Sequence, residues 1–258
     1  MVPRPLGATG LRVSPIGLGT VKLGRNSDVK YPAPFELPTP AQARELLEAA
    51  LAMGVTLYDT APAYGESEAR LAPFVAAHRD EIVLCTKAGE QWRPGASTYD
   101  FSAEAIVASV DESLKCLGTD RLDLLLLHSD GRDAEILDTT DALEGIARLK
   151  RSGKVRFAGI SAKTPEGIRA AIGCLDVVMA PFSSADPSRA TALSAAHDAG
   201  LGILAIKGLS GGRVGASAAE AVRFVLGRAF VDTLVVGTLS PTHLEEAVRS
   251  AAPDRVPA

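Results

Sequence analysis

Four side chains that can hold or move a proton follow three successive apolar runs in this sequence. Asp59 ends the run TLYD with Tyr64 five residues beyond it, Lys87 ends IVLCTK, and His128 ends LDLLLLH. A phenol has an unperturbed pKa of about 10. An ammonium group within about 4 Å would favour its ionised form by about 4 kcal/mol at a moderate dielectric. Lys87 would therefore make Tyr64 a usable acid and base.

The other two residues complete this chemistry. Asp59 would keep Lys87 charged, since a buried lysine otherwise tends to lose its proton. His128 could hydrogen-bond the same oxygen that Tyr64 protonates. Taken singly, each residue could simply cap a loop or meet solvent. Together they suit protonation of a carbonyl oxygen while another group attacks its carbon.

The elements that carry these residues alternate along the whole chain. Short apolar runs predict strands over 16–19, 56–59, 82–87, 122–128, 155–161, 177–180, 202–207 and 234–237. Amphipathic stretches predict helices over 40–53, 67–78, 102–117, 138–152, 165–172, 187–199, 217–229 and 241–251. Helix starts are marked by an N-cap followed by proline at Thr39, Thr164 and Ser240. Glycines mark helix ends at Gly54, Gly118, Gly153 and Gly200.

Strands that are apolar on both faces and alternate with helices indicate a parallel sheet covered by helices. An open doubly wound sheet is one solution. Eight units in 258 residues match the count and size of a (β/α)8 TIM barrel, which we predict as a single domain over residues 1–258. Barrel enzymes place their chemistry at the carboxyl ends of the strands, where all four residues would lie.

Composition narrows the possible partners. The net charge is −4 and no Lys/Arg cluster is present, which argues against nucleic acid or an anionic membrane as the main partner. The longest apolar run, LLLL, is far too short to span a membrane. Cys85, Cys116 and Cys174 are isolated and show no metal-ligand spacing, so we expect buried thiols in a reducing compartment. A cytoplasmic protein without a metal site is the expectation.

Several segments resemble the aldo-keto reductases, in that family's order. They are LGATGLRVSPIGLGT, YDTAPAYGESE, the TK at 86–87, DESLKCLGTDRLDLLLLH, LKRSGKVRFAGIS and VVGTLSPTHLEEAVRSA. The resemblance spans nearly the whole chain and implies a (β/α)8 barrel that reduces carbonyls with NADPH. It also implies the family's catalytic tetrad, which matches Asp59, Tyr64, Lys87 and His128.

The chain contains no G-x-G-x-x-G, so a dinucleotide would use the phosphate site of a barrel, after the seventh and eighth strands. Glycine-rich backbone and a helix start suit phosphate there. The residues concerned are Lys207, Gly208, Leu209, Gly211 and Arg213 after the seventh strand, and Gly237 and Thr238 after the eighth. The resemblance adds cofactor contacts at Gly19, Thr20, Ser161, Met179, His243 and Glu246.

The cofactor side departs from the family's pattern more than the catalytic side does. Ala162 replaces the asparagine that usually follows Ser161, Met179 replaces a glutamine, and Ala247 replaces an asparagine beside the adenine. In the family, basic residues read the 2′-phosphate of NADPH, and Gly237 and His243 stand at those positions here. The family resemblance still leads us to expect that NADPH is favoured over NADH.

Substrate contacts and the activity itself have alternatives. Val21, Trp92 and Ser129 lie in loops after the first, third and fourth strands and could line a substrate pocket, although a lone tryptophan often only fills space. The weak 2′-phosphate pattern leaves open an NAD-linked sugar (aldose) dehydrogenase. The thinned cofactor contacts leave open a cofactor-binding sensor or regulatory barrel. A metal hydrolase is disfavoured because the chain has only four histidines.

Overall fold

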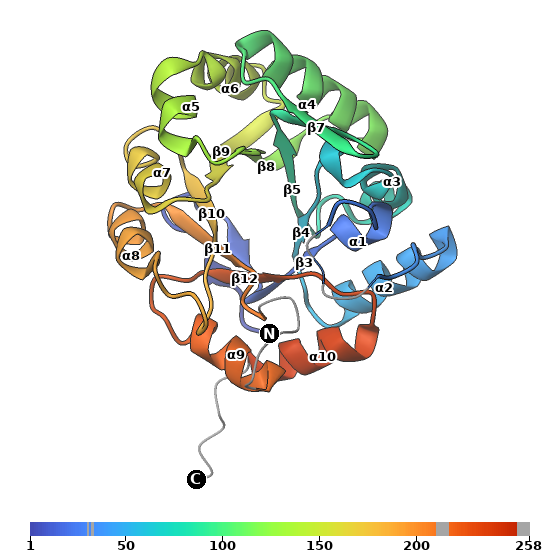
Figure 1. Ribbon diagram of the computed structural model, residues 1–258. Coiled ribbons are helices and arrows are strands. Elements are labelled where there is room, and N and C mark those ends of the chain that lie inside the picture. Colours follow the sequence, from blue (N-terminus) through green and yellow to red (C-terminus); the bar gives the residue numbers. More distant parts are fainter. Residues whose placement is uncertain (30, 32–33, 210–216, 252–258) are drawn as a thin grey trace.

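Eight parallel strands close into a barrel inside a ring of helices (Figure 1). The structure is a computed structural model that describes residues 1–29, 31, 34–209 and 217–251. Around the barrel the strands follow chain order, and the last pairs with the first. They are β3 (Ile16–Gly19), β4 (Leu57–Asp59), β5 (Val83–Ala88), β8 (Leu122–Leu127), β9 (Val155–Ser161), β10 (Val177–Pro181), β11 (Gly202–Ile206) and β12 (Thr233–Val236). The predicted (β/α)8 barrel is confirmed.

Seven of the eight predicted helices lie close to their predicted ranges, whereas α1 (Val21–Gly24) and α5 (Asp133–Thr139) were not predicted. The other helices of the outer ring are α2 (Pro40–Ala52), α3 (Ser67–His78), α4 (Ala103–Leu117), α6 (Ala142–Arg151), α7 (Pro165–Ala170), α8 (Ala190–Asp198), α9 (Ala218–Leu226) and α10 (Pro241–Ser250). The N-caps are confirmed, since the hydroxyls of Thr39, Thr164 and Ser240 each accept a backbone N–H bond from the first turn.

The single helix predicted over 138–152 is wrong, because the chain breaks between α5 and α6. Thr140 is extended, with φ −104° and ψ 167°. The hydroxyls of Thr139 and Thr140 donate to the carbonyls of Glu135 and Ile136, at 2.8 and 2.7 Å. Such side-chain bonds compete with the helical pattern, and β-branched residues have a slightly lower helix propensity, so the helix ends at Thr139.

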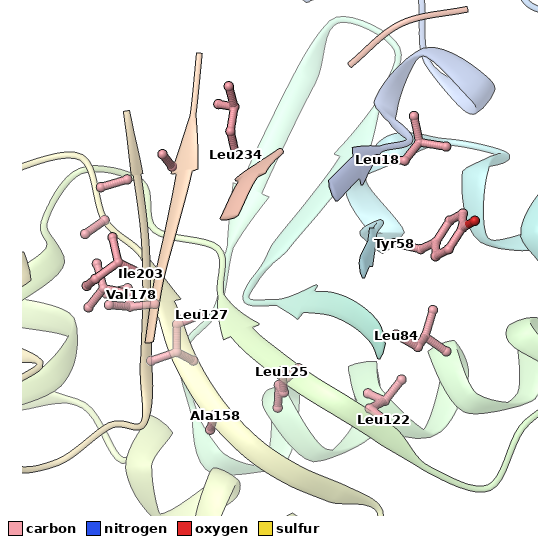
Figure 2. Close-up of a cluster of buried hydrophobic side chains, with 14 of the residues drawn as sticks. Leu18, Tyr58, Leu84, Leu122, Leu125, Leu127, Ala158, Val178, Ile203 and Leu234 are labelled. Carbon is pink, nitrogen blue, oxygen red and sulfur yellow. The ribbon is translucent and has the colours of Figure 1, made fainter. Parts of the chain in front are cut away.

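Each barrel strand is buried on both faces because it lies between two apolar layers. Side chains on the outer face, such as Leu18, Tyr58, Leu84 and Leu127, form the layer beneath the helices (Figure 2). Side chains on the inner face form a second cluster inside the barrel, made largely of Leu57, Val83, Cys85, Leu124, Leu126, Val177, Met179, Leu204 and Val235. The two sets alternate along the strands, as the period of two requires.

A short hairpin that the sequence did not predict closes the amino end of the barrel. Its strands are β1 (Arg4–Pro5) and β2 (Arg12–Val13), paired antiparallel. Leu6, Leu11 and Val13 join the inner cluster, where they are 0–7% exposed. The carboxylate of Asp232 holds the hairpin by accepting hydrogen bonds from the backbone N–H groups of Gly7 and Ile203, at 3.2 and 2.8 Å. The carboxyl ends of the strands therefore form the open mouth.

A second unpredicted hairpin follows β5 in the stretch expected to be a polar loop. It pairs β6 (Glu90–Arg93) with β7 (Ala96–Tyr99). Gly89 precedes it with φ +106°, a left-handed conformation that glycine adopts most easily. That turn directs the hairpin away from β5 and places Glu90 beside the end of the next strand, as described below.

The burial of the cysteines and the search for a membrane-spanning helix test two further expectations. Cys85 is buried in the barrel interior, but Cys116 and Cys174 are exposed, so the prediction of three buried thiols is wrong for these two. They belong to the outer ring of helices and its connections, where one side always faces solvent. Among the described residues, no helix combines the length and apolarity needed to cross a bilayer.

Candidate active site

Three of the four predicted catalytic residues occupy the last inward position of neighbouring strands. Asp59 comes two residues after Leu57 on β4, and Lys87 comes two residues after Cys85 on β5. His128 stands two residues after Leu126, just past the end of β8. Because alternate residues share a face, these side chains enter the mouth above the inner apolar cluster. The strand register places Asp59 beside Cys85, and Lys87 beside Leu126.

Lys87 and Asp59 form a buried ion pair. The Nζ atom of Lys87 lies 2.5 Å from Oδ1 of Asp59 and donates to the carbonyl of Thr60 at 2.9 Å. The two residues are only 2% and 4% exposed. Burial alone would lower the pKa of Lys87, but the carboxylate of Asp59 and the neighbouring Tyr64 raise it above its usual value. Lys87 is therefore a fixed cation at neutral pH.

Tyr64 ends the short 3-10 helix η1 (Pro62–Tyr64) and lies against both Lys87 and His128. The Nζ atom of Lys87 is 4.7 Å from the centre of the Tyr64 ring. The His128 ring is nearly perpendicular to it, with centroids 5.9 Å apart. Enclosure by protein raises the pKa of Tyr64 to about 12, although Lys87 lowers it. The expected net lowering by Lys87 does not occur, because enclosure and the charge of Asp59 outweigh it, and the phenol stays protonated at neutral pH.

His128 is held at both its backbone and its ring. Its backbone N–H donates to the carbonyl of Ala88 at 2.8 Å, which ties the end of β8 to the end of β5. Its Nδ1 atom lies 2.9 Å from Oε2 of Glu90, a contact without good hydrogen-bond alignment that becomes an ion pair only when the ring is protonated. Burial and the charge of Lys87 lower the pKa of His128, and Glu90 opposes them.

Two glycines allow the Tyr64 loop to pack closely on α1. A Cβ atom added to Gly24 would lie 2.1 Å from the backbone nitrogen of Ser67 and 2.3 Å from the carbonyl oxygen of Tyr64. Gly65, with φ +63°, approaches the carbonyl of Gly24 from the other side. The position of Tyr64 thus depends on the absence of a side chain at residue 24.

We expect Gly24→Ala to destabilise the protein by about 1–3 kcal/mol and to lower turnover, because the added methyl must push the backbone of the Tyr64 loop outward. Thermal unfolding and steady-state rates measure the two effects. Gly153→Ala is the matched control: its Cβ meets nothing within 4 Å, but its φ is +77°. That variant should lose about 1 kcal/mol from backbone strain and keep its turnover. Equal turnover in both variants would contradict the proposed role of Gly24.

The predicted substrate residues have different surroundings. Trp92, on β6, donates from its indole Nε1 to Oδ2 of Asp28 at 3.1 Å, and the Arg25 guanidinium stacks 4.4 Å from its ring centre. Trp92 therefore joins the hairpin to the loop after α1. The Ser129 hydroxyl is buried and donates to Asp133. Val21 is partly buried at the start of α1.

The predicted cofactor residues of β3, β9 and β10 lie at or near the carboxyl ends of their strands. Thr20 follows β3 and donates from its hydroxyl to the Asp59 carbonyl at 2.9 Å, so it also fixes the end of β4. Gly19 is buried at the end of β3. Ser161 ends β9 and is 8% exposed, and Met179 pairs with it from β10.

The phosphate half of the predicted site offers an exposed backbone and a cation. Lys207, just after β11, is exposed and has φ +59°, a conformation uncommon for a non-glycine residue. Gly237, after β12, is exposed. The chain then enters α10, which carries the exposed side chains of His243 and Glu246. An anionic group fits this cation and helix start.

Three of the remaining predicted cofactor residues belong to the described part of the chain, and two do not. Gly208 is buried, Leu209 is partly buried, and Thr238 accepts the backbone N–H of Ser240 at 3.0 Å. Gly211 and Arg213 lie outside the described residues. Within the described ranges no group of three or more His, Cys, Asp or Glu side chains is placed to hold a metal ion.

Two residues at the mouth were missed from the sequence. Glu90 contacts His128, and Tyr31 lies in the loop before α2, where its hydroxyl would be 3.2 Å from a Cβ on Gly237. Lys22 stands over the Tyr31 ring at 4.2 Å. Neither Glu90 nor Tyr31 belongs to a barrel strand, so the alternation that identified Asp59 could not reach them. Only their position in segments that follow barrel strands could have drawn attention.

Comparison with known proteins agrees with this geometry. Residues 15–220 match the model of the aldo/keto reductase family. The chain is 32% identical over 197 residues to a D-threo-aldose 1-dehydrogenase of a Pseudomonas species, which covers 67% of this chain and 57% of that protein. It is 37% identical over 166 residues to the L-galactose dehydrogenase of Arabidopsis thaliana, covering 61% and 47%. The chain thus spans about half the length of these relatives.

A solved structure matches over more of the chain. A crystal structure from Pseudomonas aeruginosa, described as that of a putative aldo-keto reductase, is 39% identical with a TM-score of 0.88. The match covers 96% of this chain and 93% of that one. The family match over most of the chain, on a barrel with this arrangement at its mouth, shows that the protein belongs to the aldo/keto reductase family.

Proposed function

We propose that this chain is an NAD(P)H-dependent oxidoreductase that reduces an aldehyde or ketone to an alcohol. The observation that carries the proposal is the buried Lys87–Asp59 pair beneath Tyr64, with His128 against the same ring. A bound reduced nicotinamide would supply a hydride to the carbonyl carbon. The chain's own residues would supply the proton and hold the oxygen.

Tyr64 has the properties of the general acid in this scheme. Its pKa of about 12 keeps the phenol protonated at neutral pH, so a proton is available for the carbonyl oxygen. The cation of Lys87, 4.7 Å from the ring centre, would stabilise the phenolate that remains. Asp59 keeps that cation charged and fixed. His128, which contacts the Tyr64 ring, would form a hydrogen bond to the same carbonyl oxygen.

The nucleotide would lie along β9 to β12. Ser161 suits the nicotinamide amide, while Lys207, Gly237 and the start of α10 suit the phosphates. Lys207 would bring a cation to the phosphate groups. His243 is exposed on the first turn of α10 and would stand near the adenosine end. We infer a preference for NADPH over NADH from His243, because Lys207 would contact phosphates that both nucleotides carry.

A second candidate is NAD-linked dehydrogenation of a sugar. The names of two relatives, D-threo-aldose 1-dehydrogenase and L-galactose dehydrogenase, favour it. The same four residues could run in that direction, with Tyr64 taking a proton from a hydroxyl group. The high pKa of Tyr64 favours reduction at neutral pH, because the phenol is then the acid and not the base.

Initial rates with NADPH, NADH, NADP⁺ and NAD⁺ separate these candidates. We expect 4-nitrobenzaldehyde to be reduced with NADPH about tenfold faster than with NADH, as one charge-assisted contact would give. Faster oxidation of aldoses with NAD⁺ would select the dehydrogenase. Binding is followed by the fluorescence of Trp92, the single tryptophan, and by calorimetry. Tight binding without turnover of any substrate would point to a sensor barrel, and absence of binding would refute both enzyme hypotheses.

A further inference from the structure

The two ring nitrogens of His128 have different surroundings. Nδ1 is sealed from solvent and lies 2.9 Å from Oε2 of Glu90. The side chain as a whole keeps 16% of its surface exposed, and its ring stands nearly perpendicular to that of Tyr64. Nε2 is therefore the nitrogen left for the mouth of the barrel, and Nδ1 belongs to Glu90.

Glu90 is itself held in place as an anion. Its carboxylate accepts a hydrogen bond from the Ser97 hydroxyl at 2.6 Å and lies 3.9 Å from the guanidinium of Arg25. Only 10% of its side chain is exposed. Burial would raise its pKa, but contact with His128, Ser97 and Arg25 lowers the pKa of Glu90 to about 2. The carboxylate is thus fully ionised at neutral pH.

A carboxylate beside Nδ1 determines where a neutral imidazole keeps its single proton. The proton stays on Nδ1, facing the anion, and Nε2 carries a lone pair. A lone pair cannot donate to a carbonyl oxygen. Donation from Nε2 requires a second proton on the ring, and that cation needs a counter-charge in a mostly buried site.

We propose that Glu90 is a positioning residue that keeps one proton on Nδ1 of His128 and provides the charge that lets Nε2 carry a second proton toward the carbonyl oxygen. The proposal rests on the proposed reductase function. In the proton balance, the oxygen receives its proton from Tyr64, while Nε2 only donates a hydrogen bond and keeps its own. Tyr64 is reprotonated from solvent after the alcohol leaves.

The charges around His128 set the direction of the effect. Lys87 opposes a second proton on the ring, whereas Asp59 and Glu90 favour it. Lys87 and Asp59 largely cancel because they are paired at 2.5 Å. Arg25 lies beside Glu90, and Tyr64 stays neutral up to about pH 12. Arg25 offsets part of the charge of Glu90 from 3.9 Å, and Glu90 is the anion in direct contact with the ring, at 2.9 Å.

Nitrogen-15 NMR of histidine-labelled protein tests the proton position without any nucleotide. The chain has four histidines, and His128→Asn identifies the signal of interest. At pH 8 the wild-type His128 should show a protonated Nδ1 and an unprotonated Nε2. Glu90→Gln should raise the fraction protonated on Nε2, because the amide no longer attracts the proton to Nδ1. An unchanged ratio in Glu90→Gln would overturn the proposal.

The pH profile of reduction tests the second proton. In the wild type, kcat/KM for 4-nitrobenzaldehyde should fall as pH rises through the pKa of His128. Glu90→Gln should make that fall shallower, because part of the neutral ring then carries its proton on Nε2 and still donates from it above the pKa of His128. Ser97→Ala is the control, since it removes a hydrogen bond to Glu90 and keeps its charge, and its profile should match the wild type.

These experiments distinguish a failure of the Glu90 proposal from a failure of the proposed reductase function. If Glu90→Gln and Ser97→Ala lose stability equally and neither changes the profile, Glu90 only holds the hairpin and the proposal is wrong. If the wild type reduces no carbonyl with any nucleotide, yet Glu90→Gln still redistributes the proton of His128, the reductase function fails and the control of the proton by Glu90 stands.

Discussion

Tyr64→Phe is expected to lower kcat/KM for carbonyl reduction by about 10²–10⁴-fold, the usual contribution of a positioned general acid. The substitution removes only the hydroxyl, so the ring should keep its place beside Lys87 and His128. Its effect should therefore fall on the proton-transfer step and leave nucleotide affinity unchanged. NADPH consumption with 4-nitrobenzaldehyde measures the first quantity, and quenching of Trp92 fluorescence measures the second.

Tyr58→Phe is the matched control for this experiment. Tyr58 precedes Asp59 on the same strand, but its side chain lies in the layer beneath the helices (Figure 2), and its hydroxyl donates to the Leu47 carbonyl at 3.3 Å. Tyr58→Phe should cost about 1 kcal/mol of stability and leave kcat/KM unchanged. If Tyr64→Phe retained wild-type turnover, Tyr64 would not be the acid and the enzyme proposal would lose its main support.

The largest expected effect on stability comes from Asp59→Asn. The substitution leaves the ammonium of Lys87 buried without its counter-ion, and breaking a buried pair in this way costs about 3–5 kcal/mol. Urea unfolding at pH 7 measures the loss. The double variant Asp59→Asn with Lys87→Met should recover part of it, because no buried charge then remains. Equal stability of the single variant and the wild type would show that the pair contributes nothing to the fold.

The pH dependence provides an independent check, and its sign differs between the two proteins. In the wild type the pKa of Lys87 is above its ordinary value of 10.5, so the stability that this group contributes is complete below about pH 10 and is lost above the folded-state pKa. In Asp59→Asn burial should push the same pKa below 10.5, so the unfolded chain binds more protons and stability rises with pH. The variant should therefore recover stability between about pH 7 and 10.

The barrel and three of its site residues could be predicted because they follow one repeating rule. Strands with apolar residues on both faces need a layer on each side, and a period of two places Asp59, Lys87 and His128 on the inner face at the mouth. The order of strands in the barrel is the order in the chain, so neighbouring strand ends in the sequence are neighbours in space. The local sequence pattern was therefore sufficient to predict the barrel and the position of these three residues.

What could not be predicted depends on contacts between distant loops. Glu90 reaches His128 only because Gly89 turns the chain and a hairpin forms where the sequence favours a polar loop. The pKa of Tyr64 depends on the balance between enclosure and a nearby cation, and spacing reveals only the cation. The roles predicted for the site residues, the preference between nucleotides and the extent of the domain stay predictions.

The hairpin at the amino end of the barrel has a consequence for the biosynthesis of this protein. Leu6, Leu11 and Val13 leave the ribosome long before Asp232, whose carboxylate anchors their hairpin. These apolar side chains must wait for the later barrel strands before they are covered. Contacts between such distant segments slow folding and prolong exposure to aggregation. Chaperone assistance should therefore matter most for nascent chains that still lack the last two strands.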